Sequence, residues 1–451
     1  WQHGQAQLIF SVGAAAEVRV HSLVDRDPAQ RDAAALLPPA GDVPDGTPLL
    51  GGPVVAALAA HLTAAGETSL ATLGAGAAGL AIAGPAAALQ APPQSDAEKL
   101  LDSVADNLLA LSPEGATALG IDTGARAAMR GRLGDRSAAG MTAVADTLKA
   151  DLARVRAFKS DGLDHATRTS LAVIDSAYSV ALDGFAQPYG DVAVGGWRNT
   201  PYVVIQNVGA YLDVPKFLDS DHPVKTSADA EAYLARLNDF PGVLDGETDR
   251  LKSAAGQGLI APGFLIDKAV QQMEATLADA KAGGSMVESL AHRTGEEKIA
   301  GDWRARAAKI VQGPVAAALD RQLAELRAQR PKATMDAGIW ARPHGDAFYA
   351  WALRASTTTR MTPEEVHAMG LDQLAELHGR MDPILQKLGY TKGSVGARMI
   401  ELAKDPRFKF PESDAGRAEI VAYIQTWLGK IRAELPRAFR TLVKGNVEVK
   451  R

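Results

Sequence analysis

Helix-start signals recur from about residue 95 onward, and they constrain the fold of this chain more than any other feature. In a capping box, a Ser or Thr hydroxyl accepts the N–H of the third residue along, whose carboxylate accepts the N–H of the first. Four pairs fit this pattern: Ser95 with Glu98, Ser285 with Glu288, Thr294 with Glu297, and Thr362 with Glu365. Ser112-Pro113 and Gly313-Pro314 also look like helix entries, because proline suits the first helical turn.

Apolar residues follow the same helical period, in which positions three or four apart share one face. The runs are Leu100, Leu101, Val104, Leu108 and Leu111; Leu171, Ile174, Tyr178 and Leu182; Val366, Met369, Leu374, Leu377, Met381, Leu385 and Leu388; and Ile420, Tyr423, Ile424, Trp427 and Ile431. Strand patterns are confined to Tyr202–Ile205 and to the alternation from Val447 to Lys450. We therefore predict a mainly α, multi-helix domain over residues 92–451, incomplete at its C-terminal end.

The first 91 residues look different from the rest. Residues 1–69 are rich in Ala, Gly, Pro and Asp and lack a sustained period. They fit either an unstructured leader or a mistranslated segment read from the wrong frame or start. Residues 70–91 form an apolar, small-residue run with an A-x-A cleavage pattern at 86–88, which resembles a secretory leader of the twin-arginine type.

That leader-like run lacks the basic region expected before it, because Glu67-Thr68-Ser69 stand there instead. A low-complexity linker or a short buried helix is the alternative. Glycines and a proline dilute the run, so we expect no stable membrane span. The pattern predicts an exported, periplasmic protein.

Composition excludes several classes of function. The chain has no cysteine, which excludes disulfides, thiolate nucleophiles and cysteine-based zinc sites. The formal net charge is −5, from 48 Lys and Arg against 53 Asp and Glu. A basic field that could hold a phosphate backbone is missing, so we expect no nucleic acid among the partners.

Four extended segments carry a family resemblance. They are residues 201–251, 300–326, 349–377 and 405–424, which begin PYVVIQNVGAYLDV, AGDWRARAAKIVQ, YAWALRASTTTRM and DPRFKFPESDAG. These segments resemble the domain-of-unknown-function 885 family, and together the resemblance covers roughly residues 95–451. It implies a helical, gluzincin-type peptidase fold, export from the cytoplasm, and Zn²⁺ as the cofactor of the full-length family member.

The resemblance also implies a catalytic helix with an H-E-x-x-H-like sequence and a further Glu ligand downstream. In that motif two His share a helix face and bind Zn²⁺, and the Glu takes a proton from the metal-bound water. None of the nine His residues of this chain is followed by Glu. In the family the zinc helix follows the segment that matches residues 447–451.

We therefore expect a multi-helix, peptidase-like N-terminal half that is truncated before the metal-binding helix. The chain as written would then contain no catalytic residue and would bind no metal. A helical wall built to pack on a missing half would expose an apolar face, from which we expect poor solubility or oligomerisation.

Other pairs of His and Asp residues, which could suggest metal-binding or catalytic sites, have simpler structural interpretations. His367 and His378 are too far apart along a helix to reach one ion, and His378 with Asp382 makes only a weak two-ligand site. His344 and Asp346 follow a proline and precede a helical run, which is typical of a helix cap.

Polar residues within the family-like segments are the candidates for contact with a substrate. They are Gln206, Asn207, Tyr211, Thr357, Thr358 and Thr359. Amide, phenol and hydroxyl groups can hydrogen-bond a peptide backbone or line a polar cleft. They can equally cap helices or link them through buried polar contacts.

The sequence supports two hypotheses about function. In the first, the chain is the N-terminal part of an exported zinc-dependent peptidase-like hydrolase and forms the helical wall of a cleft for a peptide or amide-containing substrate. In the second, it is a non-catalytic helical binding or scaffold protein. Whether the chain itself is an enzyme stays open, and so does its oligomeric state.

Overall fold

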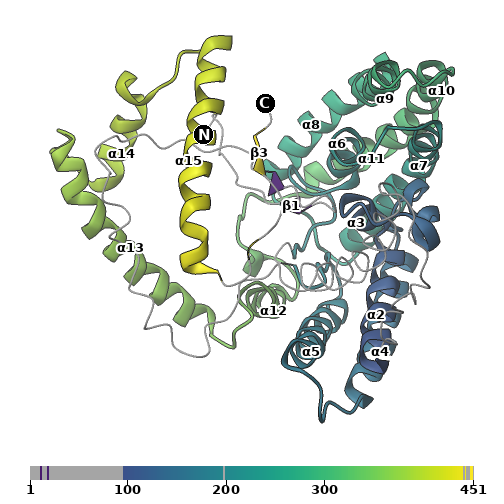
Figure 1. Cartoon of the computed structure of the whole chain (residues 1–451), viewed down its shortest axis with the longest axis horizontal. Coiled ribbons are helices and arrows are strands. Elements are labelled where there is room, and N and C mark those ends of the chain that lie inside the picture. The colour runs from purple at the N-terminus through teal and green to yellow at the C-terminus, as the bar shows by residue number, and fades with distance from the viewer. Residues whose placement is uncertain are drawn as a thin grey trace, which may run out of the picture. The chain divides into compact units, whose positions relative to one another are not determined.

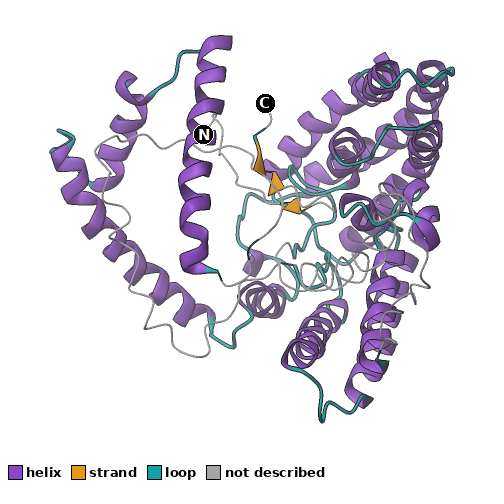
Figure 2. Ribbon diagram, viewed as in Figure 1, coloured by secondary structure: helices purple, strands orange, loops and turns teal. Residues whose placement is uncertain are grey.

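The computed structural model describes residues 95–196, 199–439, 442 and 447–449, together with two short strands near the N-terminus. This part of the chain is mainly helical, which confirms the predicted fold class (Figures 1 and 2). The α-helices are α2 Asp96–Leu111, α3 Pro113–Ala118, α4 Ala138–Ala157, α5 His165–Phe185, α6 Ala210–Ser220, α7 Ser227–Gly256, α8 Gly263–Ala282, α9 Ser285–Glu296, α10 Trp303–Ile310, α11 Ala316–Gln329, α12 Gly345–Thr357, α13 Pro363–Lys387, α14 Val395–Lys404 and α15 Asp414–Ala438.

Short elements complete the described part. The 3₁₀ turns are η2 Gly124–Gly131, η4 Arg330–Lys332, η5 Ile339–Ala341 and η6 Pro406–Phe408, and η3 Val311–Val315 is a π turn. Strand β1 Ser11–Val12 pairs antiparallel with β2 Val18–Arg19, which pairs in parallel with β3 Val447–Glu448. Apart from β1 and β2, the predicted segments 1–69 and 70–91 lie outside the described residues.

The chain divides into two compact units. The larger unit spans Leu49–Arg360, and the smaller one joins Trp1–Pro48 to Met361–Arg451. Within the larger unit α7 packs on α11, α11 on α8, and α4 on α5; within the smaller unit α13 packs on α14. Over the ranges that the structure describes, each helix is too short or too polar to cross a lipid bilayer.

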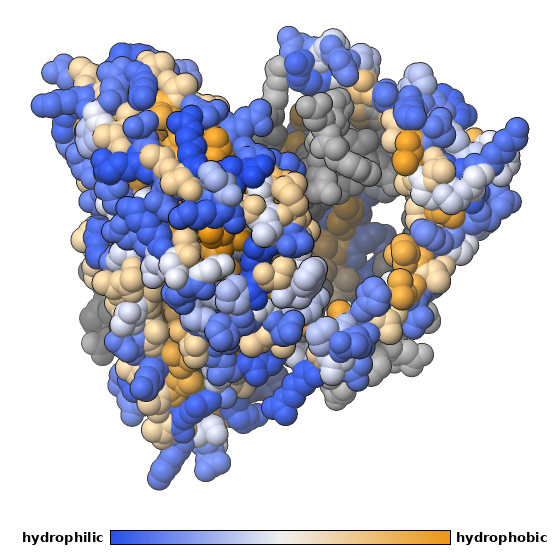
Figure 3. Space-filling view, turned by 180° about the vertical axis from the view of Figure 1, so that it is seen from behind, coloured by the Kyte–Doolittle hydropathy of each residue, from blue (hydrophilic) through white to orange (hydrophobic). Residues whose placement is uncertain are grey.

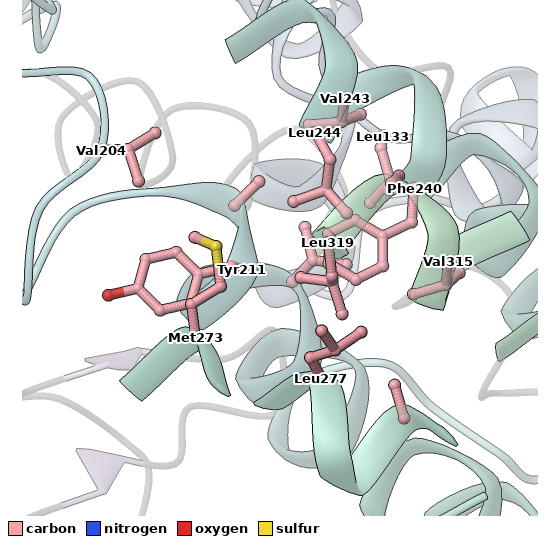
Figure 4. Close-up of a cluster of buried hydrophobic side chains, with 14 of the residues drawn as sticks. Leu133, Val204, Tyr211, Phe240, Val243, Leu244, Met273, Leu277, Val315 and Leu319 are labelled. Atoms are coloured by element: carbon pink, nitrogen blue, oxygen red, sulfur yellow. The ribbon is translucent and has the colours of Figure 1, made fainter. Parts of the chain in front are cut away.

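Two clusters of buried hydrophobic side chains lie in the larger unit. The main cluster draws on α6 to α12, and Figure 4 shows Tyr211, Phe240 and Leu319 in it. The second cluster lies among α2, α4 and α5 and contains Ile174 and Tyr178, two members of a stripe predicted from helical spacing. Burial of these faces supplies the main driving force for the fold of this unit.

The predicted helix starts are partly confirmed. Capping boxes occur at Ser95 and at Thr362. Those predicted at Ser285 and Thr294 are wrong: Ser285 is already inside α9, and Thr294 lies in the last turn of that helix, where its hydroxyl donates to a backbone carbonyl one turn earlier. A further box at Thr226 was not predicted, because its third residue is Asp and not Glu.

Other local predictions have mixed outcomes. Helix α3 begins at Pro113 as expected, but Gly313-Pro314 does not start a helix, since both residues belong to the π turn η3. Helix α13 runs through Pro383 to its end at Lys387. The β-prone run Tyr202–Ile205 is buried without forming a strand.

Charged side chains of α7 tie the segment 117–136 to this helix. Arg236 is fully buried; its Nε donates to the carbonyl of Arg132 at 2.9 Å. Its Nη2 donates to Thr117 Oγ1 at 2.7 Å and to the carbonyl of Met129 at 3.1 Å. One guanidinium therefore satisfies polar groups from three places in the segment.

A buried aspartate on α7 holds the same segment by an ion pair. Arg130 Nη1 lies 2.6 Å from Asp229 Oδ1, and Arg130 Nη2 lies 2.7 Å from Asp122 Oδ1. Burial acts to raise the pKa of Asp122, but hydrogen bonds from Arg130 and Thr117 outweigh it and lower that pKa. These carboxylates are therefore ionised members of the core.

We predict that Arg236→Met lowers the free energy of unfolding of the larger unit by about 3–5 kcal/mol, because the polar partners of a buried guanidinium would be left unpaired. Urea unfolding followed by circular dichroism measures this change. Arg304→Met is the matched control, since Arg304 pairs with Glu288 in an exposed position and should leave the midpoint unchanged. Equal effects of the two substitutions would contradict the structural role of Arg236.

His222 is buried beside Arg236 in a defined tautomer. Arg236 Nη1 donates to His222 Nδ1 at 2.7 Å, so the proton of the imidazole is on Nε2, which lies 2.9 Å from the carbonyl of Asp229. Burial lowers the pKa of His222 to about 4, and the positive charges of Arg236 and Arg293 act in the same direction. The ring is therefore neutral in the folded protein at neutral pH.

We predict that this histidine makes the fold acid-sensitive. Its pKa falls from an ordinary 6.5 to about 4 on folding, so between these pH values the folded state binds fewer protons than the unfolded state. Stability should fall as pH drops through this window, by up to about 3 kcal/mol for this group. His222→Gln, whose amide can keep both hydrogen bonds, should flatten this part of the unfolding free energy plotted against pH. An unchanged slope in the variant would contradict the assignment.

Candidate functional site

Residues 186–209 join α5 to α6 within the larger unit and contain no helix among their described residues. Asp191 and Thr200 form a two-residue bridge, with N–H to carbonyl distances of 2.8 and 3.3 Å. Arg250 of α7 donates to the Asp191 carboxylate and, at 2.9 Å, to the carbonyl of Gly190. The connection is therefore anchored to α7 near its start, at Gly190 and Asp191.

The last part of this connection presents two of the predicted site residues. Ile205 and Val208 bridge each other through N–H to carbonyl contacts of 3.0 and 3.2 Å, which places Gln206 and Asn207 at the tip of a tight turn. Asn207 is exposed, whereas Gln206 is half-buried. The Gln206 Oε1 atom is buried and has no hydrogen-bond partner in the structure, a condition that costs free energy.

Tyr211 supports this turn from the protein interior. Its side chain is buried, and its hydroxyl lies 3.0 Å from the carbonyl of Ile205 and 3.0 Å from Gln272 Oε1. Burial raises the pKa of Tyr211, and the carboxylates of Glu247 and Asp213 act in the same direction. The phenol therefore serves as a neutral donor, and its contacts in the structure are with the turn and with α8.

A buried carboxylate fixes the start of α6 directly after the turn. The cap position, Gly209, has no side chain that could accept a hydrogen bond, and its φ of 132° is unfavourable for other residues. The Glu247 oxygens instead accept the N–H of Ala210 at 2.9 and 3.0 Å. Arg136 Nη1 lies 3.0 Å from Glu247 Oε1 and 3.1 Å from Asp213.

Glu247 is fully enclosed, and burial raises its pKa while Arg136 and the Ala210 N–H act in the opposite direction. Sequence reasoning missed this residue. The available signal was an apolar helix start without a Ser, Thr, Asp or Asn cap, which requires an acceptor from elsewhere.

The three predicted threonines lie at the C-terminal end of α12. Thr357 Oγ1 donates to the carbonyl of Leu353 at 2.8 Å and lies 3.0 Å from Thr359 Oγ1. Thr358 ends the helix with a left-handed φ of 56°. These contacts are those of a helix end, and they belong to a different element from the Gln206–Asn207 turn.

The groupings that the sequence suggested for metal binding are engaged in other ways. Asp382 accepts a hydrogen bond from Arg398, while His367 and His378 are exposed along α13. His344 caps α12 through its left-handed backbone, without a side-chain hydrogen bond. Among the described residues no three His, Asp or Glu side chains lie together as a metal site requires, so these residues do not fit a bound zinc ion.

We predict that Glu247→Gln lowers the free energy of unfolding by about 2–4 kcal/mol, because it leaves the half-buried Arg136 without its buried counter-charge. Hydrogen exchange at the Ala210 amide should accelerate more than exchange elsewhere in α6. Asp213→Asn is the matched control, because this residue is 39% exposed, contacts the same Arg136 nitrogen and should have a smaller effect. Unchanged exchange at Ala210 in the Glu247 variant would contradict the capping role.

Two solved structures resemble this fold. The first, "the putative lipoprotein from Colwellia psychrerythraea", has a TM-score of 0.68 at 22% identity, over 76% of this chain and 60% of its own. The second, a "putative lipoprotein of unknown function from Shewanella oneidensis", has a TM-score of 0.50 at 15% identity, over 77% of this chain and 59% of its own. At these identities the likeness is one of fold, and the chain spans about three-fifths of the length of either relative.

No functionally curated protein matches the sequence. Residues 113–451, by contrast, match the family described as "Bacterial protein of unknown function (DUF885)", a match that includes every helix from α3 to α15. The match covers well over half of the chain and agrees with the resemblance seen in its extended segments. The chain therefore belongs to the DUF885 family.

Proposed function

We propose that this chain forms the helical wall of a substrate cleft in an exported, zinc-dependent peptidase-like hydrolase, and that the wall binds the backbone of a peptide or amide-containing substrate. The observation that supports this role is the turn from Ile205 to Val208. It combines the exposed amide of Asn207 with the buried, unpartnered amide oxygen of Gln206. The Gln206 oxygen is enclosed in the ligand-free chain, so it pairs with a ligand donor once its half-buried side chain turns outward, and this pairing relieves the cost of an unpaired buried acceptor.

The chemistry of the turn suits an amide backbone. Each peptide unit offers one N–H and one carbonyl, and a side-chain amide offers both complementary groups. The turn is also fixed before any ligand binds, by Tyr211 beneath it and by the Glu247 cap beside it. Such preorganisation reduces the conformational entropy that binding must overcome.

Export and hydrolysis belong to the same proposal. The two solved relatives are described as lipoproteins, which are exported proteins, and this supports a periplasmic location for the present chain. Hydrolysis would require zinc ligands, and the described residues form no group that could supply them. The role proposed for this chain is therefore substrate binding. The alternative function, a non-catalytic helical binding protein, would use the same turn without hydrolysis.

We predict that Gln206→Ala combined with Asn207→Ala weakens binding of a labelled alanine–glycine peptide by about tenfold or more, since each lost hydrogen bond is worth about 0.5–1.5 kcal/mol. Fluorescence anisotropy with the full chain measures the affinity. The melting temperature should not fall, because the Gln206 oxygen is already unpaired in the folded chain and Asn207 is exposed.

Asn238→Ala is the matched control, since Asn238 is an exposed amide on α7 whose side chain donates to the carbonyl of Leu234. It should leave peptide affinity intact. The proposal fails if the peptide does not bind the wild-type chain, or if both variants weaken binding equally. Binding that is never accompanied by zinc-dependent hydrolysis in the whole protein would favour the non-catalytic alternative.

A further inference from the structure

Arg342, between the short turn η5 and helix α12, is a buried guanidinium without a counter-charge. Figure 3 shows hydrophilic side chains, in blue, spread over the surface of the larger unit, at the left of the view. Charged side chains usually stay at such a surface, in water. Arg342 is only 8% exposed, and its hydrogen bonds within the described part of the chain go to carbonyl and hydroxyl oxygens, not to a carboxylate. A buried charge in this state favours an anion beside it.

The hydrogen bonds of Arg342 also leave one donor unused. Among the described residues, Arg236 and Arg398 are buried as deeply, but every side-chain nitrogen of Arg236 donates and Arg398 binds a carboxylate. Arg342 Nη1 donates to the carbonyl of Ile260 at 3.1 Å, and Nη2 donates to the carbonyl of Asp336 at 2.7 Å. Its Nε atom is buried and has no hydrogen-bond partner. The unpaired donor therefore points to a missing acceptor.

The unpaired nitrogen belongs to an edge of the guanidinium that suits a carboxylate. Nε and Nη2 lie on the same edge of the planar group, where two parallel N–H donors can bind both oxygens of a carboxylate. Nη2 also donates to Thr334 Oγ1 at 3.1 Å, a hydroxyl that an incoming oxygen can replace. Residues 334–336 are exposed and lie outside any helix or strand. They cover this edge, so they are the segment that shifts when a ligand enters.

Tyr202 supplies a second donor from the connection between α5 and α6. Its side chain is buried, and it interacts with the guanidinium of Arg342. Burial raises the pKa of Tyr202 while the positive charge of Arg342 acts in the opposite direction, so the phenol keeps its proton. The Tyr189 hydroxyl donates to the carbonyl of Pro343, directly after Arg342. The connection therefore contacts this guanidinium segment at two points.

The guanidinium also lies within reach of the candidate turn. Tyr202 precedes Gln206 by four residues, so their Cα atoms lie within about 14 Å of each other. An extended peptide of about four to six residues can therefore reach from the turn to Arg342. The negative charge that every unmodified peptide carries is its terminal carboxylate, whereas an internal segment of backbone has none.

We propose that the Nε edge of Arg342, together with the Tyr202 hydroxyl, binds the C-terminal carboxylate of the peptide whose backbone pairs with Gln206 and Asn207. This inference rests on the proposed function and narrows its ligands to short peptides with a free carboxyl end. A site of this kind selects peptide ends over internal segments, because only the end neutralises the buried charge.

The test uses an alanine–glycine peptide labelled at its N-terminus, prepared as the free acid and as the C-terminal amide. Fluorescence anisotropy with the full chain measures both affinities. The wild-type chain should bind the acid about tenfold or more tightly than the amide, since hydrogen bonds between charged groups are the stronger ones. Tyr202→Phe and Arg342→Gln should each lower the affinity for the acid toward that for the amide, and leave the affinity for the amide unchanged.

Two controls separate this site from its surroundings. Arg327→Gln makes the same substitution at an exposed arginine that pairs with Glu274, and should leave the ratio of acid to amide affinity unchanged. Gln206→Ala combined with Asn207→Ala should weaken both peptides by the same factor. Arg342→Gln also removes contacts with backbone carbonyls, so Tyr202→Phe and the amide peptide, which alters no residue, provide the test if that variant does not fold.

Equal affinity of the wild-type chain for acid and amide would overturn this inference while leaving peptide binding at the turn intact. A preference for the acid that survives both Tyr202→Phe and Arg342→Gln would place the cation elsewhere and overturn it too. If neither peptide binds, the proposed function fails, and sodium acetate added to protein with isotope-labelled arginine decides about the carboxylate site alone. A saturable shift of the Arg342 Nε–H resonance supports that site, and an unchanged resonance refutes it.

Discussion

Buried charges on α7 are the interaction on which the larger unit depends. Asp229, Arg236 and Glu247 lie on the inward side of one long helix, and each binds a residue or carbonyl from the segment 117–136. Apolar packing would hold α7 against its helical neighbours whatever the identity of that segment, because hydrophobic contact is not directional. The ionic and hydrogen-bonding contacts are directional, so they select one placement of the segment and make an error in that placement costly.

The candidate site inherits its rigidity from this arrangement. Arg136, the last residue of the segment 117–136, pairs with Glu247. The same carboxylate accepts the N–H of Ala210 and so caps the start of α6. Tyr211 in the first turn of α6 then bonds back to the carbonyl of Ile205. A chain of polar contacts therefore runs from the core helix to the turn that carries Gln206 and Asn207. A turn held in this way presents its amides with little conformational freedom, although it contains no regular secondary structure.

The sequence made the mainly helical character and the positions of several helices predictable, among them α2, α5, α13 and α15, but it did not reveal the contacts between helices. Caps at Ser95 and Thr362 involve neighbours three residues away, so the pattern is visible locally. The Glu247 cap involves a residue on another helix, and no local pattern marks it. Gln206 and Asn207 were found through family-like sequence, but the unpaired state of the Gln206 oxygen depends on the folded surroundings. The apolar run in α13 was predicted as one face of a helix, and Leu374 and Leu377 on this face are exposed in the structure.

The π turn at Val311–Val315 has a consequence for the architecture of the larger unit. A π turn adds one residue to a helical turn, so the side chains after it point in a direction rotated by roughly 100° from the regular helical course. Pro314, which cannot donate an N–H, is accommodated within this wider turn. Before it, α10 packs on α9 and α7; after it, α11 packs on α7 and α8. The continuous helix from α10 to α11 therefore keeps α7 as a neighbour throughout and exchanges α9 for α8, and the rotation between its two halves comes from a single extra residue.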